Sequence, residues 1–95
     1  MGKIPSTIFR ELYRKTKDRM AKIGSIDGDN PVYAMSKQDG CYYVSYKEVM
    51  QRFLIEGYSE KKAMMHIQKW MDYDLIFVRY SNGYKYLGFA KNTVI

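Results

Sequence analysis

The pattern of apolar and polar positions at the start of the chain predicts a helix over residues 6–23. When Thr16 is counted with them, apolar side chains recur there at gaps of three and four residues. This is the spacing of one buried helix face. Ser6 is the expected N-cap, and Gly24 follows the last turn. The stripe consists of Ile8, Phe9, Leu12, Tyr13, Thr16, Met20 and Ile23. The opposite face is basic and carries Arg10, Arg14, Lys15, Lys17, Arg19 and Lys22.

The next segment predicts a loop and two short strands. Residues 25–31 are rich in turn-forming residues. Residues 32–36 and 41–44 are β-prone, and a turn signal at 37–40 separates them. The two segments either form a hairpin together, or only one of them pairs with the rest of the sheet.

Two helices joined by a short turn are predicted from residue 45 onward. Ser45 and Glu48 form a capping box in front of an apolar periodicity, and Gly57 ends that helix. Ser59 then caps a second helix. The expected buried face of the first helix is Val49, Met50, Phe53 and Leu54. The expected buried face of the second is Ala63, Met64, Ile67, Trp70 and Met71.

The end of the chain predicts a β-hairpin. Asn82 and Gly83 lie between two alternating segments, residues 76–81 and 84–89, and Asn-Gly is the strongest short signal for a two-residue hairpin turn. This turn fixes the pairs as Ser81 with Tyr84, Arg79 with Tyr86, Val78 with Leu87, and Ile76 with Phe89. One face is then apolar, with Ile76, Val78, Leu87 and Phe89. The other face carries Phe77, Arg79, Tyr84 and Tyr86.

Charge narrows the class of partner. The 95 residues include sixteen Lys and Arg against ten Asp and Glu, giving a net charge of +6, and ten of the aromatic residues are tyrosines. A positive field favours nucleic acid or an anionic membrane surface, although it also serves solubility. The length is that of one domain, so residues 1–95 are expected to form a single unit. No apolar run approaches the roughly 18 residues of a membrane span, so we expect no membrane partner.

Residues suited to catalysis are sparse. Cys41 is the only cysteine and His66 the only histidine, and no phosphate-binding glycine loop or zinc-ligand spacing occurs. Asp27 and Asp29 flank a glycine, but Gln38 stands where a calcium loop needs a glutamate. We therefore expect no catalytic site, no metal and no cofactor. The single cysteine and the lack of an apolar leader indicate a cytoplasmic protein.

The order of elements over residues 45–89, about half the chain, resembles the winged helix-turn-helix superfamily. The likeness is carried by the short turn at Gly57 and Tyr58 and by the Asn82-Gly83 hairpin, and it includes no diagnostic motif. The compact form is also similar to small proteins of phages, plasmids and other mobile elements, one group of which binds single-stranded DNA. The resemblance implies an α+β fold with three helices, a small antiparallel sheet and a C-terminal hairpin wing.

The resemblance implies that the second helix of the motif enters the major groove of DNA. Its expected reading face consists of Lys61, Lys62, Met65, His66, Gln68 and Lys69. Glutamine can pair with adenine, and lysines can contact guanine or phosphate. The face has no arginine, which predicts low sequence specificity. The alternative is an ordinary solvated helix face.

The wing supplies a second set of candidate contacts. Its expected nucleic-acid residues are Arg79, Asn82, Tyr84, Lys85 and Tyr86. Exposed aromatic rings beside cations are what single-strand binders use for base stacking. The alternative is that this face of the hairpin packs on the first helix or on a second subunit.

These observations predict a non-enzymatic DNA-binding protein with a regulatory or DNA-maintenance role. A first alternative is single-stranded DNA binding through the wing aromatics in a mobile element. A second is a protein-interaction module, such as a replication accessory subunit or an anti-defence protein, to which the many tyrosines and methionines are suited. The first helix is either a DNA contact or a homodimer interface.

Overall fold

The computed structural model describes residues 2–23 and 31–91. Within these residues the elements follow in the order α1 (Pro5–Ile23), α2 (Pro31–Asp39), β1 (Tyr43–Ser45), α3 (Tyr46–Ile55), α4 (Glu60–Asp72), β2 (Ile76–Ser81) and β3 (Tyr84–Phe89). The predicted loop with Asp27 and Asp29, and the side chains of Lys22 and Ile23, lie outside the described residues.

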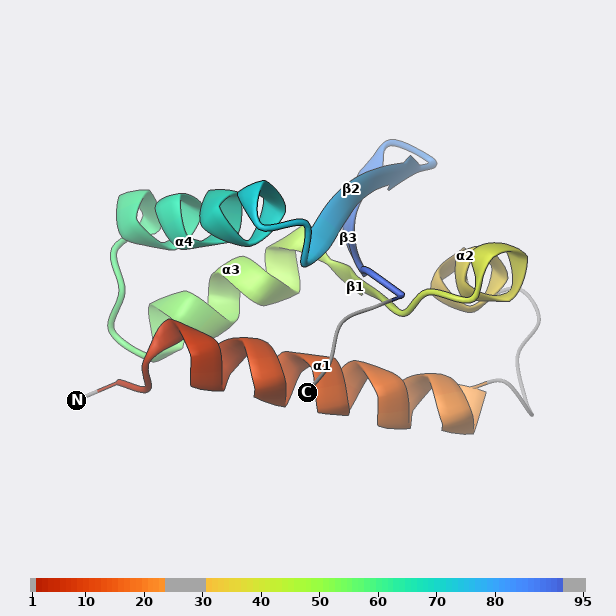
Figure 1. The fold of residues 1–95 in the computed structure, drawn as a ribbon, viewed down its shortest axis with the longest axis horizontal. Coiled ribbons are helices and arrows are strands. Elements are labelled where there is room, and N and C mark those ends of the chain that lie inside the picture. Colours follow the sequence, from red (N-terminus) through yellow and green to blue (C-terminus); the bar gives the residue numbers. More distant parts are fainter. Residues whose placement is uncertain (1, 24–30, 92–95) are drawn as a thin grey trace.

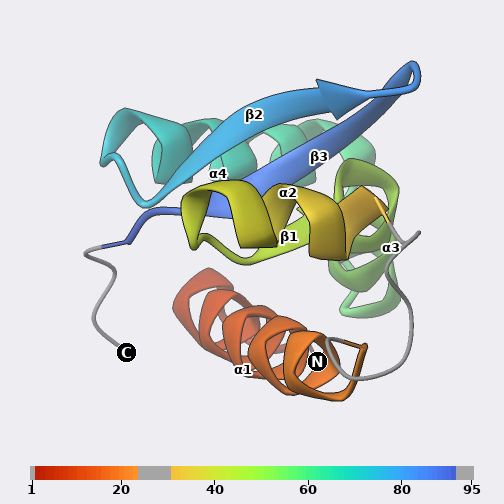
Figure 2. The same ribbon diagram turned by 90° about the vertical axis from the view of Figure 1, so that its right-hand side faces the viewer.

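The three strands form one antiparallel sheet in the order β1-β3-β2. Helices α1, α3 and α4 pack on one face of this sheet, and α2 lies on the other (Figures 1 and 2). The fold is therefore α+β with a small antiparallel sheet, as predicted, and it is compatible with a winged-helix-like arrangement. The described residues contain four helices where three were expected, because α2 was predicted as a strand.

Helix α1 begins one residue earlier than its predicted cap. Pro5 occupies the first helical position, where its fixed φ suits the helix and its missing N–H costs nothing. The Ile4 carbonyl accepts from the N–H groups of Thr7 and Ile8, at 3.1 Å each. Ser6 is thus inside the first turn, and its prediction as N-cap is wrong.

The segment expected to be the strand 32–36 is part of helix α2. Pro31 again opens the helix, and Gly40 ends it with a φ of 76°. Met35 is buried in a second apolar cluster with Cys41, Tyr43 and Tyr86. Packing of this short helix on the sheet outweighs the β propensity of its sequence, which is a weak and context-dependent preference.

Of the predicted capping box at the start of α3, the Ser45 cap is confirmed, whereas the Glu48 carboxylate is engaged by another helix. Ser45 Oγ accepts from the Glu48 N–H at 3.1 Å. The Glu48 carboxylate accepts from both terminal nitrogens of Arg19 in α1, at 3.0 Å each. Glu48 therefore joins the two helices, and its pKa is lowered by these hydrogen bonds from Arg19.

The turn between α3 and α4 is fixed by local hydrogen bonds. Gly57 has a φ of 93°, which favours glycine, and its N–H donates to Leu54 O at 3.0 Å. The Tyr58 N–H donates to Phe53 O at 3.0 Å, completing a Schellman motif in which the Tyr58 and Phe53 rings meet edge to face. Ser59 Oγ then accepts from the Lys62 N–H at 3.2 Å, which confirms the predicted cap of α4.

The hairpin has the register that the sequence predicts. The pairs are Ser81 with Tyr84, Arg79 with Tyr86, Val78 with Leu87 and Ile76 with Phe89. Asn82 and Gly83 both have positive φ, at 51° and 81°, as a type I′ turn requires.

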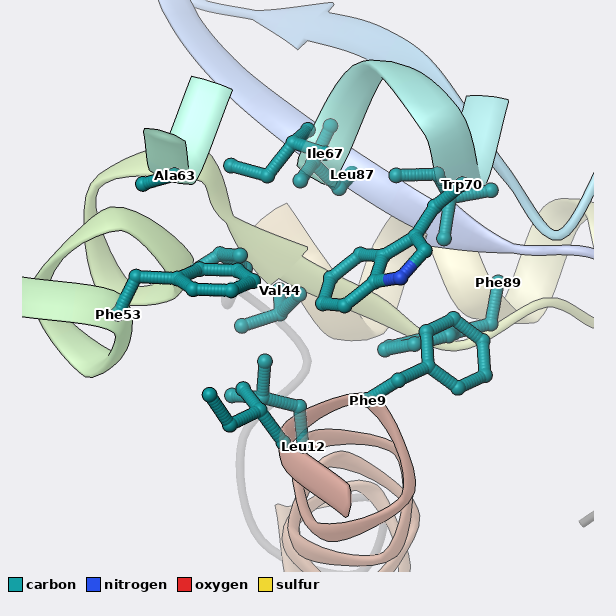
Figure 3. Packing of buried hydrophobic residues seen from close by; sticks show 12 residues of the cluster. Phe9, Leu12, Val44, Phe53, Ala63, Ile67, Trp70, Leu87 and Phe89 are labelled. Carbon is teal, nitrogen blue, oxygen red and sulfur yellow. The ribbon is translucent and has the colours of Figure 1, made fainter. Parts of the chain in front are cut away.

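The main core lies between the sheet and helices α1, α3 and α4 (Figure 3). Its buried members are Ile8, Phe9, Leu12, Val44, Val49, Phe53, Ala63, Ile67, Trp70, Ile76, Leu87 and Phe89. Trp70 of α4 meets Phe9 of α1 edge to face, with ring centroids 5.0 Å apart. Leu54 and Met64, both expected in the core, are exposed, because each lies at the margin of its helix stripe.

Candidate nucleic-acid interface

The outward face of α4 carries most of the predicted reading residues. Ala63, Ile67 and Trp70 are buried, so the residues on the far side of the helix face solvent. The exposed predicted residues are Lys61, Lys62, Met65, Gln68 and Lys69. Their predicted exposure is confirmed, whereas their contact with DNA stays a prediction.

Two of these lysines stand where helix electrostatics disfavour them. Lys61 and Lys62 are the second and third residues of α4, next to the partial positive charge of the helix N-terminus. Glu60 is the acidic residue of the same turn. Within the described residues neither lysine takes part in an ion pair. An anion bound at this turn would be attracted by both lysines and by the helix end.

His66 is less accessible than predicted. It is half-buried, with its ring stacked on Phe53 at 6.0 Å and edge to face with Tyr58 at 5.5 Å. Burial lowers the pKa of His66, and the positive charges of Lys69 and Lys62 lower it further. At pH 7 the neutral imidazole is therefore favoured, and His66 contributes little charge to the α4 face.

Gln68, the predicted adenine reader, is engaged along its own helix. Its amide nitrogen donates to Asp72 Oδ1 at 3.0 Å. Both side chains are exposed, and an exposed i,i+4 pair is worth only about 0.2–0.5 kcal/mol, so a base edge could compete for the amide.

The wing arginine is held by α2. Arg79 donates to Asp39 Oδ2 at 3.0 Å and to Gln38 Oε1 at 2.7 Å. The Tyr43 hydroxyl also donates to Asp39, and burial together with this bond raises the pKa of Tyr43 to about 12. To reach a phosphate, Arg79 would have to give up these partners.

The predicted open aromatic face of the hairpin is only partly open. Tyr86 is 9% exposed and packs under α2, so its expected exposure is wrong, whereas Tyr84 is 68% exposed. Helix α2, and not the first helix, covers the part of this face that is buried. Asn82 is exposed at the turn. Lys85 is half-buried, with its ammonium 4.2 Å from the centre of the Tyr46 ring.

The arginines divide into two groups. Arg19, Arg52 and Arg79 each form an ion pair with a carboxylate. Arg10 and Arg14 are exposed on α1, and in the described part of the chain neither forms one. The sequence placed both on a basic face but gave no sign that they lie beside Lys69 of α4 along one groove.

Other kinds of site find no support in the described residues. Among them, no group of three or more His, Cys, Asp and Glu side chains is arranged to hold a metal ion. Cys41 is buried, and burial raises the pKa of its thiol, which disfavours the reactive thiolate. None of the described helices is both long enough and apolar enough to cross a bilayer.

Comparison with known proteins yields no match: no protein-family model, no curated protein and no solved structure is significantly similar to this chain.

Proposed function

We propose that this protein binds duplex DNA through the outward face of α4, with the wing beside it, and catalyses no reaction. The observation that carries this proposal is the pair Lys61 and Lys62. Both lysines are exposed, and neither forms an ion pair among the described residues. They lie in the first turn of α4, where the partial positive charge of the helix end disfavours cations. Phosphate groups would relieve that unfavourable placement.

The arrangement of neighbouring residues supports the same surface. Met65, Gln68 and Lys69 continue the exposed face of α4 after the two lysines. In helix-turn-helix proteins the second helix enters the major groove while adjacent cations hold phosphates. With no arginine on this face, phosphate attraction would dominate over base reading. A regulatory or DNA-maintenance role suits such binding.

The wing favours duplex over single-stranded DNA as its ligand. Stacking of unpaired bases needs accessible rings. On this face of the hairpin Tyr86 is buried, Phe77 is 36% exposed and Tyr84 is 68% exposed. Arg79, the cation on this face, is bound to Asp39. The predicted single-strand platform of the wing therefore has one of its two tyrosines available.

Titration of labelled duplex DNA with the wild-type chain and with a Lys61→Ala/Lys62→Ala variant tests the proposal. We expect the variant to bind about tenfold more weakly, since each phosphate contact is charge-assisted. The log–log dependence of affinity on salt should also flatten by about 1.8, because each lost phosphate contact removes about 0.9 from the slope. The helix should remain stable, because both substitutions remove charge from a disfavoured position.

A matched control removes two exposed lysines from the other end of the molecule. Lys17 of α1 and Lys37 of α2 are exposed and border one hollow, to which α4 contributes no residue. Helix α2 lies at the end of the molecule away from α4 (Figure 1). The Lys17→Ala/Lys37→Ala variant has the same net charge as the test variant and should keep near wild-type affinity. Equal losses in both variants would contradict a specific role of α4. If the wild-type chain bound neither duplex nor single strands, a protein-interaction module would replace this proposal.

A further inference from the structure

A groove of about 650 Å³ runs between the N-terminal half of α1 and the C-terminal half of α4. Its size falls within the range of small-molecule and cofactor sites, about 300–1,000 Å³. Arg10 and Arg14 line it from α1, and Lys69, Trp70 and Tyr73 line it from α4. This groove was not anticipated from the sequence, because its walls are more than fifty residues apart along the chain.

The groove is built to attract negative charge. Arg10 and Arg14 are four residues apart on α1, and within the described residues they are the arginines without an ion pair. Lys69 lies on the opposite wall. The first turn of α1 also borders the groove and contains no acidic residue, so the positive end of that helix is not neutralised by its own side chains. Guanidinium groups at this spacing suit a phosphate.

The groove also offers flat apolar surface beside these cations. Tyr73 is 74% exposed at the C-cap of α4. Trp70 is largely buried in the wall and is backed by Phe9, which fixes its ring (Figure 3). Rings beside cations are suited to a ligand with both a flat heterocycle and a phosphate. Inorganic phosphate or an aliphatic acid would leave the rings unused.

We propose that this groove binds a nucleoside phosphate, with the phosphate held by Arg10, Arg14 and Lys69 and the base stacked on Tyr73. The unit is either a free nucleotide or a nucleotide within a single strand. The inference goes beyond duplex binding by the outward face of α4 and does not rest on it. Lys69 borders both surfaces, so neither test uses it.

Emission of Trp70, the only tryptophan of the chain, provides a local readout. The wild-type protein is titrated with thymidine monophosphate, with a 5′-phosphorylated thymidine trinucleotide and with inorganic phosphate, and binding is measured in parallel by calorimetry. We expect the trinucleotide, the mononucleotide or both to bind and to change the emission. If both ligands change the emission, the groove accepts a free nucleotide as well as a nucleotide within a strand. If only the trinucleotide does, the ligand is a single strand.

Variants then assign the contacts. Arg10→Ala/Arg14→Ala should weaken nucleotide binding by about tenfold or more, since charge-assisted hydrogen bonds are lost. The matched control Lys15→Ala/Lys17→Ala removes the same charge from α1 outside the groove and should bind normally. Tyr73→Ala should weaken binding about five- to hundredfold, whereas Tyr73→Phe, which keeps the ring, should retain it.

Several outcomes overturn the inference. One is that no nucleotide binds, and another is that the double arginine variant binds the nucleotide with unchanged affinity. The inference also fails if inorganic phosphate binds as tightly as the nucleotide, or if an acidic peptide competes for the groove as well as a nucleotide does. Because the Lys61→Ala/Lys62→Ala variant leaves the groove intact, it should still bind the nucleotide. Failure of duplex binding and failure of the groove are therefore separate results.

Discussion

Arg79 of β2 donates a hydrogen bond of 3.0 Å to the Asp39 carboxylate at the end of α2. The same carboxylate accepts from the Tyr43 hydroxyl and from the Cys41 N–H. Burial opposes ionisation of Asp39, but the hydrogen bonds from Tyr43 and Cys41 and the charge of Arg79 outweigh it, so its pKa is lowered. One side chain thus fastens α2 to two strands of the sheet.

Replacement of Asp39 by alanine should release α2 from the sheet. Three donors lose their acceptor, and the expected loss in free energy of unfolding is about 1–3 kcal/mol. Amide hydrogen exchange should speed up in α2 while α4 stays protected. Asp18→Ala removes an exposed carboxylate from α1 and serves as the control. An Asp39→Ala variant as stable as this control would contradict the anchoring role.

The two tyrosines of β3 should respond differently to truncation. Tyr86 is packed under α2, so Tyr86→Ala should lower the free energy of unfolding by about 3 kcal/mol. Tyr84→Ala should change it by no more than about 0.5 kcal/mol, since the ring faces solvent. Urea denaturation measures both. Equal effects of the two substitutions would mean that α2 does not cover this face.

Asp74 is a site where glycine should improve stability. Its φ is 59°, its N–H donates to Met71 O, and the Leu75 N–H donates to Trp70 O, so a Schellman motif ends α4 with aspartate in the left-handed position. Asp74→Gly should raise the free energy of unfolding by about 0.5–1 kcal/mol.

The control is the same substitution two residues earlier. Asp72 lies in the last turn of α4 with helical geometry. There glycine is less favourable than aspartate by roughly 0.3 kcal/mol, and the hydrogen bond from Gln68 is lost as well. Thermal unfolding of the two variants should therefore shift in opposite directions. A drop in both would show that Asp74 carries a favourable contact that outweighs its backbone conformation.

His66 should make the protein less stable in mild acid. Its pKa in the folded chain lies below the ordinary value of 6.5, through burial and then through Lys69 and Lys62. Between pH 6.5 and the lower pKa of the folded chain, the unfolded chain therefore binds more protons than the folded one. The free energy of unfolding is therefore highest above pH 6.5 and falls as the pH drops toward the folded pKa.

Comparison with His66→Gln isolates this effect. The variant loses the stacking on Phe53 at every pH, but its stability should decline less than that of the wild type between about pH 7.5 and about pH 5.5. Parallel curves would show that His66 titrates normally.

Features set by neighbouring residues were predictable from the sequence. The hairpin register followed from Asn82 and Gly83, whose positive φ angles only a few residue types accept. The caps at Ser45 and Ser59 followed because a hydroxyl at that position can reach the N–H three residues on. The exposure of the outward face of α4 followed from helical periodicity.

The early part of the chain was harder to predict. Ser6 was expected as a cap because it is a common one, but Pro5 is already helical. The segment 32–36 has β-branched and aromatic residues, and nothing local reveals that Met35 packs against Tyr86, about fifty residues away. Short elements depend on such packing, because their own propensity is small.

By itself, the sequence determined the elements from Ser45 onward, the register of the hairpin, the solvent face of α4 and the excess of positive charge. The tertiary structure alone decided the helical state of α2, the burial of Tyr86, the pairing of Arg79 with Asp39, and the groove between Arg10 and Tyr73. The physical reason is the range of the interactions involved. Caps, turns and periodicity act within a few residues, whereas burial, ion pairing and grooves depend on which distant segments the fold brings together.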